Sequence, residues 1–133
     1  SHITEQSFRL ISDDKEWKVV WARHLGTTPE DAYCPRLAID FQQCLVIAIF
    51  KGKVRNSRGI QLNSIAETVD LITVQFTTLG YQSTLATAKQ LPETPFAFIV
   101  IPKMAKNIVI EEGVVSKRQP TAAEWKEVAR LNH

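Results

Sequence analysis

The sequence predicts an α+β fold: a largely antiparallel β-sheet or partly closed barrel of about five to seven strands, flanked by an N-terminal and a C-terminal α-helix. Three observations support this prediction. Amphipathic helical patterns with capping signals stand near both ends of the chain. Short apolar or alternating segments fill the middle. The connections between them are mostly too short for βαβ crossovers, which favours antiparallel pairing.

The first helix is predicted to begin at Asp13. Asp13 is a good N-cap with Glu16 three residues later, an arrangement like a capping box, although Ser12 is a competing cap. Gly26 supplies the stop signal. The apolar face of this helix is predicted to consist of Trp17, Val20, Trp21, His24 and Leu25.

The tryptophans of this helix allow two interpretations. Trp17 and Trp21 could form a recognition surface, because indole side chains are common hot spots of protein interfaces. They could equally be core residues of a helix that packs on a sheet, and we favour this second interpretation. His24 lies in the last turn, so we interpret it as a packed or capping residue rather than as a ligand.

Four segments in the middle of the chain are predicted to be strands. Cys44–Phe50 is short, continuous and rich in β-branched residues, which is typical of a central strand covered on both faces. A polar turn at residues 51–59 would join it to residues 60–65 in a long hairpin. Residues 70–78 alternate, and residues 96–101 are expected to form a second buried strand.

The remaining segments are a loop, a hairpin and the second helix. Residues 82–91 are weakly patterned and fit a short strand or an irregular crossing. Residues 108–110 and 114–115 are predicted to form a hairpin across the sequence Glu-Glu-Gly. The C-terminal helix is placed at residues 120–131, because Thr121 and Glu124 form a capping box. Its apolar face would contain Trp125, Val128 and Ala129.

Length and composition indicate one domain spanning residues 1–133. The 16 basic and 14 acidic residues are spread along the chain, and a nucleic-acid-binding protein would usually be more lopsided. The longest apolar run is far shorter than the roughly 18 residues of a membrane span, so we expect none. We interpret Ser1 and His2 as remnants of trimming, and the sequence leaves open whether a targeting segment or lipid anchor preceded them.

Several short pieces occur together in a specific order over residues 8–110. They are Glu16-Trp17 with Trp21 and His24, then Asp40-Phe41 before the strand to Gly52 and Gly59, then Thr94-Pro95-Phe96 before Ile101-Pro102-Lys103. In this combination the chain resembles the PrcB-like C-terminal domain. That family is named after a lipoprotein subunit of a bacterial surface protease complex, in which the domain is thought to bind and stabilise the protease. The resemblance implies an exported or cell-surface protein without known catalytic activity, and it leaves the C-terminal helix outside the matched region.

Few residues point to catalysis or to a cofactor. A triad of His24 with Cys34 or Cys44 as nucleophile and Asp40 as orienting group is conceivable, but no nucleophile elbow or cysteine-protease signature accompanies it. The two cysteines fit a short-loop disulfide in an exported protein and reduced thiols in the cytosol. Neither CxxC, a Walker loop nor GxGxxG is present, so we expect no metal, no nucleotide and no cofactor.

The densest basic cluster is the candidate partner contact, and it consists of Lys51, Lys53, Arg55 and Arg58. The functional interpretation is that these cations attract an acidic partner. The alternative is a solvated turn that protects a sheet edge, and we favour this alternative. No aromatic residue is interleaved with these cations, which argues against single-stranded nucleic acid.

These observations favour a non-enzymatic, extracytoplasmic protein-interaction domain in the periplasm or at the cell surface. It would stabilise or regulate a surface protease or another envelope protein. The first alternative is a small-molecule or glycan-binding module with a cleft between the first helix and the sheet, and the second is a hydrolase. The sequence does not identify the partner or the oligomeric state.

Overall fold

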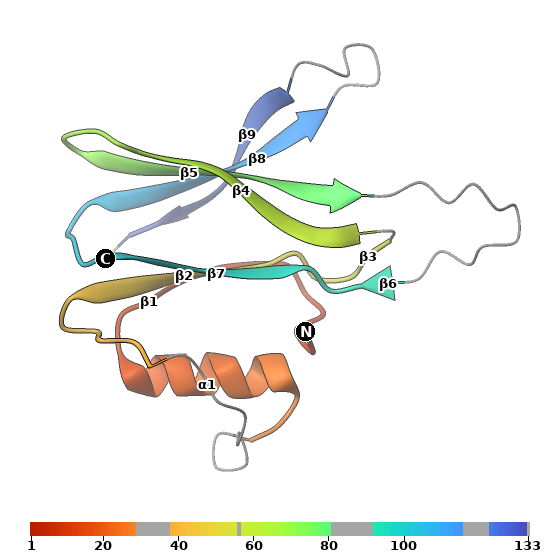
Figure 1. Cartoon of the computed structure of the whole chain (residues 1–133), viewed down its shortest axis with the longest axis horizontal. Coiled ribbons are helices and arrows are strands. Elements are labelled where there is room, and N and C mark those ends of the chain that lie inside the picture. Colours follow the sequence, from red (N-terminus) through yellow and green to blue (C-terminus); the bar gives the residue numbers. More distant parts are fainter. Residues whose placement is uncertain (29–37, 56, 81–91, 116–122, 133) are drawn as a thin grey trace, which may run out of the picture.

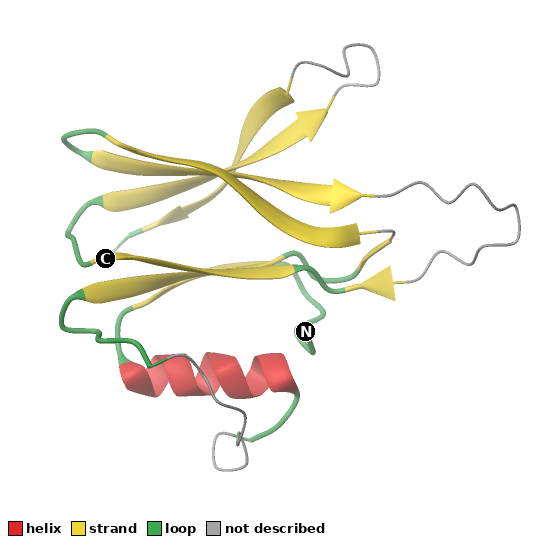
Figure 2. Cartoon of the chain, in the orientation of Figure 1, coloured by secondary structure: helices red, strands yellow, loops and turns green. Residues whose placement is uncertain are grey.

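The computed structural model describes residues 1–28, 38–55, 57–80, 92–115 and 123–132. Within these residues the elements are β1 (Ser7–Ile11), α1 (Asp14–Leu25), β2 (Cys44–Phe50), β3 (Val54–Arg55), β4 (Ser57–Glu67), β5 (Leu71–Gly80), β6 (Pro92–Glu93), β7 (Phe96–Pro102), β8 (Asn107–Val115) and β9 (Ala123–Leu131). Strands dominate this part of the chain and it contains a single helix (Figure 2). The fold is therefore mostly β, and the predicted α+β arrangement with a helix at each end is wrong.

Two principal sheets and one helix form three layers (Figure 1). The strand order is β1-β2-β7 in the three-stranded sheet and β4-β5-β8-β9 in the four-stranded sheet, with a small ladder of β3 and β6 beside them. Helix α1 covers the face of the three-stranded sheet that points away from the four-stranded sheet. The sheets approach each other where β1 lies near β9 and β4 lies near β7, but the partly closed barrel that we expected is not formed.

Strand β2 belongs to both cores of the molecule. Its residues Leu45, Ile47 and Ile49 enter the core between the two sheets. The alternate residues Val46, Ala48 and Phe50 enter the core beneath α1. Because successive side chains of a strand point to opposite faces, a continuous apolar run is needed where both faces are covered. The predicted central strand is thus confirmed.

The pairing partners of β2 differ from the prediction. β2 pairs antiparallel with β1 and β7, whereas residues 60–65 lie in β4 and pair with β5. The expected long hairpin through residues 51–59 is therefore wrong, and Ser7–Ile11 forms a strand that the sequence analysis did not identify. β5 also pairs in parallel with β8, since the chain crosses to the other sheet through β7 between them.

Helix α1 forms as predicted, for the predicted reasons. The Asp13 carboxylate accepts the N–H of Glu16 at 2.6 Å, and Gly26 ends the helix in the left-handed conformation with φ of 75°. Trp17 and Val20 are buried against the three-stranded sheet. The Trp17 ring meets Phe98 of β7 edge-on, with 5.0 Å between ring centroids. The interpretation of Trp17 as a core residue is confirmed.

The C-terminal segment is a strand, and a bulge explains why its sequence resembles a helix. Ile110 of β8 pairs with Ala129, while the adjacent Glu111 pairs with Glu127, so Val128 is an extra residue in β9. Such a bulge shifts the alternation of the strand by one residue. Val128 and Ala129 therefore both pack against the core between the sheets, as neighbouring residues of a helix face would, whereas Trp125 lies on the opposite face of β9.

The glycine between residues 108–110 and 114–115 is not in a turn. β8 runs without interruption through Gly113, which pairs with Trp125 of β9, so the predicted hairpin is wrong. A Cβ atom on Gly113 would lie 3.0 Å from the six-membered ring of Trp125 and 2.8 Å from Cγ2 of Thr77. Gly113 is therefore required for close approach of the indole to the strand. The predicted crossing at residues 82–91 lies outside the described residues.

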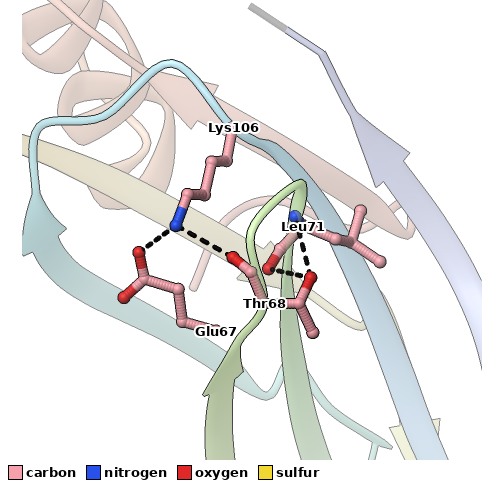
Figure 3. Close-up of polar contacts among 4 residues, drawn as sticks. All are labelled: Glu67, Thr68, Leu71 and Lys106. Atoms are coloured by element: carbon pink, nitrogen blue, oxygen red, sulfur yellow. Dashed lines mark hydrogen bonds and ion pairs between the residues drawn. The ribbon is translucent and has the colours of Figure 1, made fainter.

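A lysine after β7 holds the turn between β4 and β5 (Figure 3). Lys106 Nζ contacts the carboxylate of Glu67 and donates to the carbonyl oxygen of Thr68 at 2.9 Å. Within the turn, the N–H of Leu71 donates to Oγ1 of Thr68 at 3.1 Å. The contact links the loop before β8 to the hairpin that pairs beside it, so it supports the register of the parallel β5–β8 pair.

Replacement of Trp17 by alanine should destabilise the domain by about 3 to 5 kcal/mol, because the cavity left beneath α1 cannot be filled by its neighbours. Urea denaturation followed by circular dichroism measures this free energy of unfolding. The matched control is Val19→Ala, since Val19 lies on the exposed side of the same helix and should change the free energy by less than about 0.5 kcal/mol. Equal effects of the two substitutions would contradict the packing role of Trp17.

Candidate functional site

The last turn of α1 brings His24 into an aromatic cluster. The other members of this His24 cluster come from α1, the end of β2 and the start of β7, and they are Trp17, Trp21, Phe50, Phe96 and Phe98. Phe50 and Phe96 are direct partners in the β2–β7 register, which places both rings at the same end of the sheet. The His24 ring lies closest to Phe96, with 4.2 Å between centroids. The space between helix and sheet is thus filled by rings.

His24 is 8% exposed, and it contacts the first two residues of the chain through polar atoms of its side chain and backbone. Its Nδ1 lies 2.8 Å from Oγ of Ser1, and its carbonyl oxygen accepts the N–H of His2 at 2.9 Å. The pKa of His24 is lowered, mainly because burial disfavours the charged imidazolium, and also because the Ser1 amino group and His2 carry like charge. The neutral ring is therefore the form favoured by the fold.

Trp21 contributes an unusual polar group to the His24 cluster. Its indole N–H is buried and has no hydrogen-bond acceptor among the described residues. A buried donor without a partner costs about 1 to 3 kcal/mol. The tilted ring contacts of Trp21 with Trp17 and Phe98, at centroid distances of 5.5 and 5.6 Å, offset part of this cost.

The residues considered for a catalytic triad are separated in the structure. His24 contacts Phe50 at one end of β2, whereas Cys44 begins the strand at its other end. Six residues of extended chain separate these ends, a distance of roughly 20 Å. The Asp40 carboxylate accepts the N–H of Gln42 at 3.0 Å and so caps a local turn. Cys44 carries a free thiol, and Cys34 lies outside the described residues.

The predicted basic contact surface is only partly available to a partner. Lys51 forms an ion pair with Glu112 of β8, with 2.8 Å between Nζ and Oε2 and side-chain exposures of 12% and 19%. Thr78 donates to the same carboxylate at 3.2 Å. Lys51 therefore links the two sheets, while Lys53 is exposed. The side chains of Arg55 and Arg58 lie outside the described part of the structure.

The outer strand of the three-stranded sheet exposes apolar side chains that the sequence analysis placed in the interior. Phe96 is 41% exposed and Val100 is 47% exposed, although both occur in the segment predicted to be a second buried strand. The strand is present as predicted, but β7 is a sheet edge, so its covering is incomplete. A run of six apolar residues was the available signal, and it could not distinguish a central strand from an outer one.

An open pocket lies beside the first residues of β7. Its volume is about 310 Å³, and its lining residues are Ser1, Ser57, Gly59, Glu93, Thr94, Pro95 and Phe96. The segment that carries Lys51 and Lys53 adjoins this pocket, because the Lys51 N–H donates to the carbonyl oxygen of Pro95 at 3.0 Å. The pocket thus combines an exposed ring, a carboxylate and small polar groups next to an outer strand.

Comparisons with known proteins identified no relative of this chain. No family model matches the chain, and neither a curated protein nor a solved structure does. In the described part of the chain, no three His, Cys, Asp or Glu side chains gather where they could hold a metal ion. Within the described residues, no helix is long and apolar enough to cross a membrane.

Replacing Lys51 by alanine should lower the free energy of unfolding by about 1 to 3 kcal/mol, because Glu112 would keep its partly buried charge without a partner. Chemical denaturation at neutral pH measures the change. Lys53→Ala is the control, because it removes an exposed cation from the same turn. If both variants retain the stability of the parent chain, the ion pair has no structural role.

The stability of the domain should fall as the pH drops below about 6.5, the ordinary pKa of histidine. In this range the unfolded chain protonates His24 before the folded chain does, since the pKa of His24 is lowered only in the fold. The loss continues until the pH passes the folded-state pKa. Urea denaturation between about pH 5.5 and 8 should show this slope for the parent chain and a smaller one for His24→Phe. Identical slopes would contradict the assignment to His24.

Proposed function

We propose that this chain is a non-enzymatic protein-interaction domain that binds an extended segment of a partner protein along the free edge of β7. The observation that carries the proposal is the character of that edge. β7 pairs with β2 in an unbroken register, and within the described residues no strand pairs with its other side. Its apolar residues include the exposed Phe96 and Val100. An unprotected edge of this kind is a template for an added strand.

The outer strand of the neighbouring sheet provides a contrast. β4 carries two register irregularities, between Ser57 and Gly59 and between Leu62 and Ser64. Bulges of this kind protect a sheet edge, because they bend the strand and interrupt its hydrogen-bonding pattern. β7 has no such irregularity and no charged residue between Phe96 and Ile101. Strand addition is therefore better supported at β7 than at β4.

The surroundings of β7 favour a partner segment with an apolar stretch and an acidic flank. The pocket at Phe96 offers a place for one anchoring side chain of the partner. Lys53 is exposed on the turn that is hydrogen-bonded to Pro95, so a positive charge lies close to the strand. Local charge of this sign accelerates association with acidic partners.

The resemblance of the sequence motifs to the PrcB-like domain supports the compartment and the class of partner that we propose. That resemblance supports an exported domain, lipid-anchored in the full-length protein, whose partner is a surface protease or another envelope protein. The alternative of a ligand cleft between helix and sheet has less support, because the His24 cluster fills that space. The hydrolase alternative has less support as well, because His24 and Cys44 lie at opposite ends of β2.

A lysine on the free edge tests the proposal. Val100→Lys adds a charge to the centre of the edge, where it should prevent addition of an apolar strand and weaken partner binding by about tenfold or more. The immobilised domain would be incubated with envelope extract, and captured proteins would be quantified by mass spectrometry. Val69→Lys is the matched control, because Val69 is exposed in the β4–β5 turn. A partner retained equally by both variants would contradict binding at β7.

A further inference from the structure

The outward face of the four-stranded sheet carries an exposed tryptophan that the fold does not need as a core residue. Trp125 is 36% exposed and lies on the side of β9 that points away from the core between the sheets. Its six-membered ring lies beside Gly113 of β8 and Thr77 of β5, in the space that a side chain on Gly113 would fill. The absence of a side chain at Gly113 thus lets the indole lie on the sheet.

Polar side chains on the same face are held by hydrogen bonds across three strands. Ser64 of β4 donates to the Gln75 side chain of β5 at 2.9 Å, and Gln75 donates to Glu111 of β8 at 2.9 Å. In the next row, Thr77 donates to the Asn63 side chain at 3.0 Å. Groups that are oriented by one another lose little conformational entropy when a ligand binds.

The two rows offer a regular array of polar groups and an indole to a ligand. Side chains of one face repeat every second residue, about 6.6 Å along a strand, and neighbouring strands are about 4.8 Å apart. The indole offers an apolar surface with a negative π-face to the C–H groups of a sugar, and the amide, hydroxyl and carboxylate groups beside it suit sugar hydroxyls.

We infer that this face, defined by Trp125, Glu111, Gln75, Thr77, Asn63 and Ser64, is a binding site for an uncharged glycan chain. The charged groups of this face favour an uncharged ligand over an anionic one. Among the described side chains of the face, the cation Arg130 is paired with Glu127 at 2.7 Å, and Glu111 adds a further carboxylate. Nucleic acids and anionic polysaccharides are bound through unpaired cations, and here their charges would meet carboxylates. The inference does not depend on the function proposed for β7, which lies in the other sheet.

The test uses the whole chain and three uncharged oligosaccharides: cellohexaose, chitohexaose and maltohexaose. Isothermal titration measures binding, and tryptophan fluorescence locates it, because Trp17 and most of Trp21 are covered while Trp125 is exposed. We expect at least one of the three to bind and to shift the emission. Trp125→Ala should weaken binding by about tenfold or more, since stacking on an aromatic anchor is lost.

Two further variants separate binding from folding. Asn63→Ala removes an exposed polar group from the outer strand and should weaken binding by a measurable factor while the far-ultraviolet circular dichroism stays unchanged. The control is Glu124→Gln, because Glu124 lies in the same strand as Trp125 but on its opposite face and pairs with Val114. It should bind like the parent chain.

Three results would overturn the inference. One is that none of the three oligosaccharides binds at millimolar concentration. Another is that a bound oligosaccharide is unaffected by both Trp125→Ala and Asn63→Ala. The last is that heparin or oligo-dT binds through Trp125 more tightly than the uncharged sugars do. None of these results bears on capture of a protein by β7, so the two proposals fail separately.

Discussion

Burial of β2 on both faces is the constraint on which the rest of the structure depends. Alternate side chains of this strand enter two different cores, so neither α1 nor the four-stranded sheet can be removed without exposing three apolar residues of β2. A slip of one residue in the pairing would exchange the two sets between the cores. Ile47, with its large side chain, would then point toward the helix, where the smaller Ala48 now lies beneath the aromatic rings.

Polar contacts connect the parts that this constraint brings together. Lys51 leaves the end of β2 and reaches Glu112 in the other sheet, and Lys106 ties the loop before β8 to the β4–β5 turn. Each lysine joins segments that are distant in sequence but adjacent in space. A cation that looks available on a turn can thus be part of the internal structure, as Lys51 is.

The layered arrangement leaves two surfaces with different chemistry. The edge of β7 is apolar and offers backbone groups, whereas the outward face of the four-stranded sheet is polar and carries one indole. They occur in different sheets, so a protein segment at one and a glycan at the other would not compete for the same residues.

Local sequence alone determined the elements whose signals lie within a few residues. Asp13, the apolar spacing after it and Gly26 define α1, and the continuous apolar run identifies β2 as a strand covered on both faces. The burial of Trp17 followed from the same spacing. Tertiary structure decided which strands pair, because β2 meets β1 and β7 rather than the segment that follows it in the chain. It also decided the state of residues 123–131, where pairing with β8 and one bulged residue, Val128, override a helix-like pattern. The exposure of Phe96 and the use of Lys51 in an ion pair depend on where other strands end, and no short stretch of sequence contains that information.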